Sequence, residues 1–210
     1  MKLTVLGASG GIGIELVRQA LAAGHHVTAV VRATSRLEVD AHPSLEVVVA
    51  DVLDPEAIAP AIAGRDAVLS ALGPRTTGPT TIMTAGTQSI LRAMESAGVR
   101  RLLVVSLAAI HTTGDDPFTR FVVKPILGRI LRHSFADARA MEAEIRSSAL
   151  DWTVVCPPRL RNGPAKGRIR SARERTIRGG FSITRADAAA YLLTALGDPT
   201  TTPATIVISN

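Results

Sequence analysis

The stretch Leu3-Thr4-Val5-Leu6-Gly7-Ala8-Ser9-Gly10-Gly11-Ile12-Gly13 decides the fold of this 210-residue chain. Its apolar first part predicts a strand, and a helical pattern opens within the glycines. Gly7 permits a tight turn, Gly10 lets the backbone approach a diphosphate, and Gly13 lets the helix pack closely on the sheet. The start of the helix supplies unpaired N–H groups for phosphates. We therefore expect a dinucleotide to bind at Gly7, Ala8, Ser9, Gly10, Gly11, Ile12 and Gly13.

The rest of the chain alternates short β-rich runs with longer helical patterns. Strands are predicted at 3–6, 26–31, 46–49, 67–69, 102–105, 153–155 and 205–208. Helices are predicted near 11–23, 55–63, 79–97, 117–132, 135–148 and 185–196. Gly24 and Gly98 stand where helices would end on a left-handed residue, and Thr184 with Asp187 is similar to a capping box. The pattern predicts an α/β fold: a Rossmann-like, doubly wound parallel sheet in a single domain, residues 1–210, with a small substrate-lid region.

The end of the second predicted strand indicates which nicotinamide cofactor binds. A site that prefers NADH would place Asp or Glu here to accept from the ribose hydroxyls. This chain has Arg32, a planar cation suited to a 2′-phosphate, and Ser35 and Arg36 could complete the pocket. A solvated surface arginine would look the same. The placement favours the functional interpretation, so the expected cofactor is NADPH more than NADH.

Two further strand ends are placed to contact the cofactor. Asp51 and Val52 follow the third predicted strand, where they would meet the adenine, although Asp51 could equally be a neighbour of the next helix start. The fourth strand closes on a turn that would allow backbone contact with the ribose and diphosphate, formed by Ala71, Leu72 and Gly73. A plain strand-to-loop turn would have a similar sequence.

Two segments break the alternation, residues 111–117 and 157–180, and they open the expected substrate-region segments 111–133 and 157–183. Both follow the carboxyl ends of strands, where open α/β sheets bind ligands, so we expect them to form walls of a substrate pocket. His111 and His133 flank the first segment and could face the substrate. Within the second, the alternation of Gly167-Arg168-Ile169-Arg170 suggests part of a hairpin.

The net charge of +6 is local. Between Arg159 and Arg178 there are eight basic residues and one acid, so the remainder of the chain is nearly neutral. This distribution argues against nucleic acid as a partner, as does an aromatic content of 3%, which leaves little for base stacking. The basic segment could hold an anionic acceptor such as FMN, although a solvated loop is the more common meaning of such a stretch.

Other counts exclude several classes of protein. The single cysteine, Cys156, rules out an internal disulfide and a multi-cysteine zinc site and is expected to be a core thiol. The five histidines have no metal-binding spacing, so no metal is expected. Glycines interrupt the opening apolar run too early for a signal peptide, and the most continuous later one is half a membrane span. We expect a cytoplasmic monomer or homodimer without a membrane partner.

With these residues in view, the chain resembles the atypical short-chain dehydrogenases/reductases, closest to the branch of the NADPH-dependent flavin reductase and biliverdin reductase B. The resemblance covers nearly the whole chain and includes the glycine turn, Val31-Arg32, Ala50-Asp51-Val52, the stretch 79–94, Val105-Ser106 and Pro157-Pro158.

This resemblance implies roles for residues at the nicotinamide end of the site. Ser106 would lie near the nicotinamide and the substrate; the residues implied to flank the nicotinamide are Pro157, Pro158 and Arg159, and those implied to lie near the pocket are Thr80 and Thr81. Two positions depart from the family pattern: Ser89, where the family often has Asn, and Ala138, which aligns approximately with a histidine of the pocket helix. The departures place a tetrapyrrole substrate in more doubt than the fold.

The chain lacks the acid–base pair of the standard short-chain dehydrogenases, a Tyr with a Lys four residues later. Its one tyrosine, Tyr191, is followed at that distance by Ala195. A flavin needs less from the protein, because the cofactor carries the chemistry and the pocket stacks and orients it. The expected function is an NADPH-dependent reductase that transfers hydride to a flavin, as substrate more than as prosthetic group, with Ser106 as the catalytic residue. Biliverdin, a quinone or an enone are other small-molecule acceptors, and an NADP(H)-binding redox-sensing regulator without turnover is the alternative.

Overall fold

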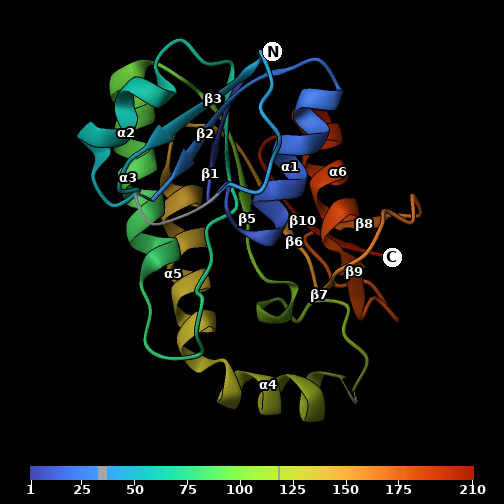
Figure 1. Cartoon of the computed structure of the whole chain (residues 1–210). Helices are drawn as coiled ribbons and strands as arrows, with labels where there is room; N and C mark the ends of the chain where they lie inside the picture. The colour runs from blue at the N-terminus through green and yellow to red at the C-terminus, as the bar shows by residue number, and fades with distance from the viewer. Residues whose placement is uncertain (33–36, 118) are drawn as a thin grey trace.

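The computed structural model describes residues 1–32, 37–117 and 119–210, which contain an eight-stranded sheet in the order β3-β2-β1-β4-β5-β6-β10-β8 (Figure 1). All pairs are parallel except that of β8 with β10 at one edge. The strands are β1 (Lys2–Leu6), β2 (His26–Val31), β3 (Leu45–Val49), β4 (Ala67–Ser70), β5 (Arg101–Val105), β6 (Asp151–Cys156), β8 (Arg170–Arg173) and β10 (Ala204–Ser209). Two short strands, β7 (Arg159–Arg161) and β9 (Ser182–Thr184), pair with each other.

Helices cover both faces of the sheet, as a doubly wound fold requires. On one face α1 (Gly11–Ala22) packs beside α6 (Arg185–Leu196). On the other face lie α2 (Pro55–Ile62), α3 (Ile82–Ala97) and α5 (Arg132–Ser147) (Figure 1). Neighbouring residues of β1 and β5 enter opposite cores, which is why both strands are apolar at consecutive positions. The predicted fold class is therefore confirmed.

The strand order reverses at β1, whose neighbours are β2 on one side and β4 on the other. From β1 the chain runs outward to β3, and then from β4 outward to β6 in the opposite direction. Such a reversal leaves a crevice at the carboxyl ends of the strands, where open α/β sheets bind ligands.

The helix ends follow the predicted residues closely. Gly24 and Gly98 have φ angles of +80° and +66°, so both occupy the left-handed region after a helix. Thr184 Oγ1 accepts the N–H of Asp187 at 3.0 Å and caps α6. The Asp187 carboxylate instead accepts the N–H groups of Lys166 and Gly167, each at 3.0 Å. This half capping box therefore also anchors the loop that precedes β8.

The helix predicted at 117–132 is divided. Thr119–Val123 forms a π-helical turn, α4 is Lys124–Ile130, and α5 begins at Arg132 instead of residue 135. Pro125, the second residue of α4, has no N–H to donate, so a regular α-helical ladder cannot continue through it. In Figure 1, α4 lies apart from the sheet at the foot of the molecule.

The hairpin expected around residues 167–170 is wrong. β8 pairs antiparallel with β10, with Ser171 opposite Ile208, and not with a strand next to it in the sequence. The open edge of β10 offers unpaired backbone groups, and β8 satisfies them. None of the described helices is both long and apolar enough to cross a bilayer.

Candidate nucleotide and substrate cleft

The turn between β1 and α1 requires glycine at two of its positions. Gly7 has a φ of +75°, and a Cβ there would lie 2.8 Å from the carbonyl carbon and oxygen of Ala71. A Cβ at Gly13 would lie 2.2 Å from Gly7 O. The N–H of Gly10 donates to Gly7 O at 2.9 Å and closes the turn. The geometry gives Gly7 the turn and Gly13 the close packing that the sequence predicts.

The N-terminus of α1 is open to an anion. Its N-cap is Gly10, which offers no side-chain cap, and its first turn contains no acidic residue. By contrast, α2 is capped by Asp54 and α6 by Thr184. Helix starts have N–H groups without intrahelical partners, and those of α1 are left for a ligand. This arrangement fits the diphosphate of a dinucleotide.

A cleft of about 700 Å³ begins at this turn and follows the carboxyl ends of β1, β2, β4, β5 and β6. Its volume is in the range of small-molecule sites. Most of the predicted site residues line it: Gly7, Ser9, Gly10, Gly11, Ile12, Arg32, Val52, Ala71, Leu72, Gly73, Thr80, Ser106, Pro157 and Pro158. The same cleft is thus lined by the turn after β1, the predicted phosphate position, and by Ser106 after β5, the predicted nicotinamide position.

Three arginines line the cleft, Arg32, Arg75 and Arg185, and its described lining contains no carboxylate. Arg185 lies against the turn itself. Its Nε and Cδ are so close to Gly11 that a Cβ on that residue would clash with them, so the guanidinium group lies over the start of α1. Its Nη1 donates to Asn162 Oδ1, which holds the side chain in place. No local pattern in the sequence indicates Arg185, since only the packing of α6 beside α1 brings it to the turn.

The basic segment between Arg159 and Arg178 does not supply this positive lining. None of its eight basic residues, all of them described, is among the lining residues of the cleft. Arg170 donates to the carbonyl oxygens of Arg178, Gly179 and Asn210. Arg173 donates to those of Thr200 and Pro203. These guanidinium groups fasten β8 and the chain end, which explains part of the charge without an anionic substrate.

Several predicted site residues lie outside the lining. Ala8 and Gly13 are buried beneath the turn, and Asp51 is exposed, with its carboxylate accepting the N–H of Leu53 at 3.0 Å. Thr81 and Arg159 are exposed beside residues that do line the cleft. The predicted Ser35 and Arg36 fall outside the described residues.

The two histidines that could face the substrate, His111 and His133, are not among the described lining residues of the cleft. His133 is the acceptor for Nε of its neighbour Arg132, while Leu131 and Ser134 on either side line the cleft. His111 turns behind Ser106 toward α5. Strand ends decide which loops border the cleft, but the side-chain directions within a loop depend on packing that a sequence pattern does not give.

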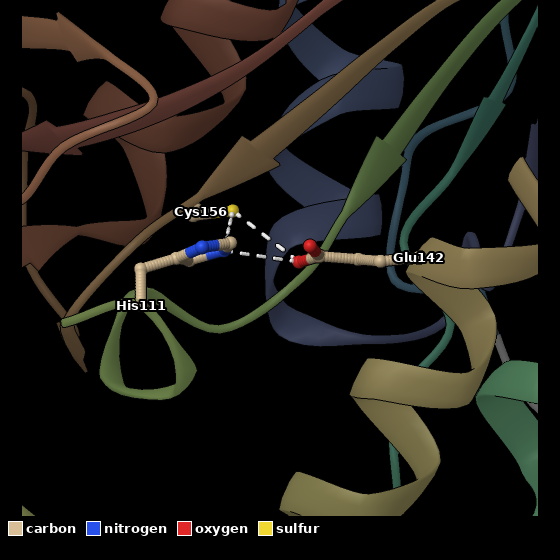
Figure 2. A group of neighbouring side chains, drawn as sticks. All are labelled: His111, Glu142 and Cys156. Carbon is tan, nitrogen blue, oxygen red and sulfur yellow. Dashed lines mark hydrogen bonds and ion pairs between the residues drawn. The ribbon is translucent and has the colours of Figure 1, made fainter. Parts of the chain in front are cut away.

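Ser106 is joined to a buried polar cluster. Its Oγ donates to Glu142 Oε1 at 2.5 Å, and the same oxygen lies 3.1 Å from His111 Nε2. Cys156 Sγ is 3.3 Å from that nitrogen and 3.7 Å from that oxygen. Figure 2 shows the three side chains of His111, Glu142 and Cys156 pointing toward one another from the loop after β5, from α5 and from the end of β6.

The electrostatics of the cluster keep the carboxyl charged and the thiol neutral. Burial alone would raise the pKa of Glu142, but hydrogen bonds from His111 and Ser106, with Arg146 close by, outweigh it and lower that pKa. Burial raises the pKa of the Cys156 thiol well above its usual value, and the Glu142 carboxylate adds to this rise. Cys156 is thus a protonated core thiol, as its position at the end of an apolar strand predicts.

Sequence reasoning missed Glu142, although one signal was present. Ala138, Met141 and Ile145 form the buried stripe of α5, and Glu142 falls within that stripe. A carboxylate on the buried face of a helix is rare unless it is paired. The same helix places Asp137 where it accepts the N–H groups of Met83 and Thr84 and so caps α3 beside the cleft.

Comparison with known proteins agrees with this geometry. The sequence model of the NAD(P)H-binding family matches residues 7–199. The UPF0659 protein of Saccharomyces cerevisiae is 29% identical over 96% of this chain and 89% of its own length. Three other curated relatives are matched over only 34–38% of their length, so the chain spans about a third of those three proteins.

Solved structures share the fold over the whole chain. A short-chain dehydrogenase/reductase from Veillonella parvula, solved in complex with NADP, has a TM-score of 0.83 and 21% identity, covering 100% of this chain and 94% of that one. A protein from Streptococcus pneumoniae proposed to be an NADH-flavin reductase has a TM-score of 0.80 and 23% identity, covering 100% and 99%.

Proposed function

Because this chain belongs to the NAD(P)H-binding family, we propose that it is an NADPH-dependent reductase that transfers hydride to a flavin or a similar conjugated acceptor. The observation that carries the proposal is one continuous cleft with an uncapped helix N-terminus and Ser106 in its lining. When bound, the nicotinamide supplies the hydride. The residues of the chain bind the phosphates, orient the rings and exclude water.

The charge of the cleft supports NADPH over NADH. Arg32 follows β2, where a 2′-phosphate would lie, and no carboxylate among the described lining residues is available to the ribose hydroxyls. Arg75 and Arg185 add positive charge that suits the diphosphate or a phosphorylated acceptor.

The apolar part of the lining supports a planar acceptor. Leucine, isoleucine, methionine and proline side chains dominate the walls away from the turn, at Leu72, Pro74, Ile82, Met83, Leu107, Leu131, Pro158 and Leu160. The one tyrosine, Tyr191, packs against the core beneath α1 and α6 and is not part of this described lining. A conjugated ring that accepts hydride directly needs no alcohol-activating tyrosine. The neighbour proposed to be an NADH-flavin reductase makes FMN the first acceptor to test.

The deciding experiment follows NADPH absorbance with FMN, riboflavin, biliverdin and the quinone menadione in parallel. We expect consumption with FMN or riboflavin that is slower with NADH and is lost in Ser106→Ala but not in Ser147→Ala, an exposed serine at the end of α5. Tight NADPH binding without consumption of any acceptor would instead favour an NADP(H)-binding regulator. Turnover with menadione or biliverdin alone would keep the reductase and replace the flavin.

A further inference from the structure

We propose that His111 and Glu142 form a proton relay that supplies Ser106 while the acceptor is reduced. The proposal rests on the proposed reductase function and goes beyond it, because it gives a role to two residues that lie behind the cleft lining. Ser106 is the group that touches the acceptor, and the other two act through it.

The geometry supplies an unbroken path from Ser106 in the cleft lining through Glu142 to His111 on the loop after β5. Ser106 lines the cleft, although only 1% of its surface is exposed, and its Oγ–H donates to Glu142 Oε1 at 2.5 Å. His111 Nε2 lies 3.1 Å from the same oxygen. A single carboxylate oxygen therefore touches both the hydroxyl and the imidazole. The His111 side chain keeps 16% of its surface exposed, so water can reach part of the ring.

The charged groups around the relay hold it in this arrangement. Arg146 Nη2 lies 3.4 Å from Glu142 Oε2, so it engages the oxygen that Ser106 and His111 leave free. Cys156 faces both Nε2 and Oε1, and its raised pKa makes it a neutral hydrogen-bond donor and not a competing base. Lys124 donates to the carbonyl oxygen of His111 and pairs with Asp115 at 2.5 Å, which fixes the loop that carries the imidazole.

The proton balance of the step is simple. Reduction of the acceptor by hydride leaves a negative charge on the acceptor that one proton neutralises. The hydroxyl hydrogen of Ser106 turns from Glu142 Oε1 to that atom and its O–H bond breaks there, while Oγ forms a new O–H bond with a proton from Glu142 Oε1. Glu142 receives this proton from Nε2 of the protonated His111, so the net change is that His111 becomes neutral. Solvent then restores its proton.

A purely structural role for the cluster makes a different prediction. The charge of Glu142 could simply be stabilised by the hydrogen bonds to its carboxylate, and any residue that donates at the position of Nε2 would then serve. Glutamine at 111 can donate such a bond but cannot pass a proton on to Glu142. The variant His111→Gln therefore separates the two roles.

The first test measures kcat and KM for FMN with NADPH across pH, in H2O and in D2O. For wild type we expect a fall in kcat toward alkaline pH and a solvent isotope effect. For His111→Gln we expect kcat at neutral pH to be about tenfold lower, with KM unchanged and the pH dependence lost. This loss is smaller than the rate contribution of a typical general acid, about 10²- to 10⁴-fold, because His111 acts through Ser106. His42→Asn, a surface histidine whose Nδ1 accepts the N–H of Ser44, is the matched control and should keep the wild-type profile.

The second test needs no turnover. In the ligand-free protein, spectra of ¹⁵N-labelled histidine side chains should show the Nε2 signal of His111 change in both Glu142→Gln and Ser106→Ala, while His42 keeps its signal. Thermal unfolding and NADPH titration establish that each variant is folded.

Two results would overturn the relay and leave the reductase intact: His111→Gln with wild-type kcat and pH profile, or a His111 signal that is insensitive to Ser106→Ala. A wild-type protein that consumes no acceptor would remove both proposals. Zinc titration gives a further outcome, because the donor atoms of His111, Glu142 and Cys156 lie within 4.8 Å of one another. Stoichiometric zinc binding that His111→Gln abolishes would make the cluster a metal site and overturn the relay.

Discussion

Replacing Gly13 by alanine tests whether the close approach of α1 to the turn is needed for cofactor binding. The added Cβ would lie 2.2 Å from Gly7 O, 2.8 Å from Ala8 Cα and 2.9 Å from Gly7 C. These atoms belong to the backbone of the turn, so no side chain can move aside. The start of α1 must shift away from the turn by more than about 1 Å to restore an ordinary contact of ~3.5 Å.

The shift should affect both stability and binding. Overpacking of this kind lowers the free energy of unfolding by about 1–3 kcal/mol. Because the turn and the helix start hold the diphosphate together, we expect NADPH affinity to fall at least about tenfold, or ~1.4 kcal/mol. Urea unfolding gives the first quantity and NADPH fluorescence titration the second.

The matched control is Gly197→Ala. Gly197 ends α6 with a φ of −92°, and no atom lies within 4 Å of the Cβ that alanine would add there. We expect this variant to keep both stability and affinity, or to gain a few tenths of a kcal/mol from the less flexible unfolded chain. If Gly13→Ala behaves like Gly197→Ala in both measurements, the reasoning from the turn geometry is refuted.

Three further predictions concern charged residues. Arg32→Asp should weaken NADPH binding by about 10- to 100-fold and NADH binding much less, since one charge-assisted bond contributes about 1.5–3 kcal/mol; equal losses in the two titrations would contradict a 2′-phosphate site. Arg185→Met should raise the dissociation constant for NADPH about tenfold, whereas Arg92→Met, on the exposed face of α3, should leave it unchanged in the same titration. An unchanged dissociation constant in Arg185→Met would show that Arg185 only packs on Gly11. Burial opposes the charge of Asp187, but hydrogen bonds from backbone N–H groups and Thr184 stabilise that charge and lower its pKa. The charge therefore contributes to stability above the pKa of the unfolded chain, near ~3.9, and this contribution is lost as pH falls through the lower pKa of the folded protein. The free energy of unfolding of Asp187→Asn should therefore be about 1–3 kcal/mol lower than that of the wild type at pH 7, and the difference should narrow below about pH 4. Urea unfolding at a series of pH values measures it, and a difference that is independent of pH would show that the charge is not involved.

The fold was largely predictable because each of its elements carries a local signal. Consecutive apolar residues in the strands reflect two covered faces, and glycines at 24 and 98 have the left-handed φ that their positions after helices suggested. The errors fall where local signals compete. Pro125 divides a helix that periodicity alone makes continuous, and β8 pairs with a distant strand because the edge of β10 is open.

The candidate site was predictable where one strand end and its turn form a unit. Residues from Gly7 to Gly13 and the position of Arg32 after β2 follow from spacing along the chain. Arg185 is 174 residues from Gly11 and meets it only because α6 packs beside α1. No periodicity within a single segment indicates which other segment will lie against it.

By itself, the sequence determined a doubly wound sheet with a glycine turn shaped for a dinucleotide, because turn sterics and apolar periodicity act over a few residues. Only the tertiary structure decided where the charge and the proton-bearing groups meet. Arg170 and Arg173 of the basic segment hold β8 to neighbouring carbonyl oxygens. Ser106, His111, Glu142 and Cys156 converge because β5 and β6 are neighbours and α5 packs beside their ends. The physical reason is that side-chain contacts between distant segments depend on strand order and helix packing, which the whole fold sets at once.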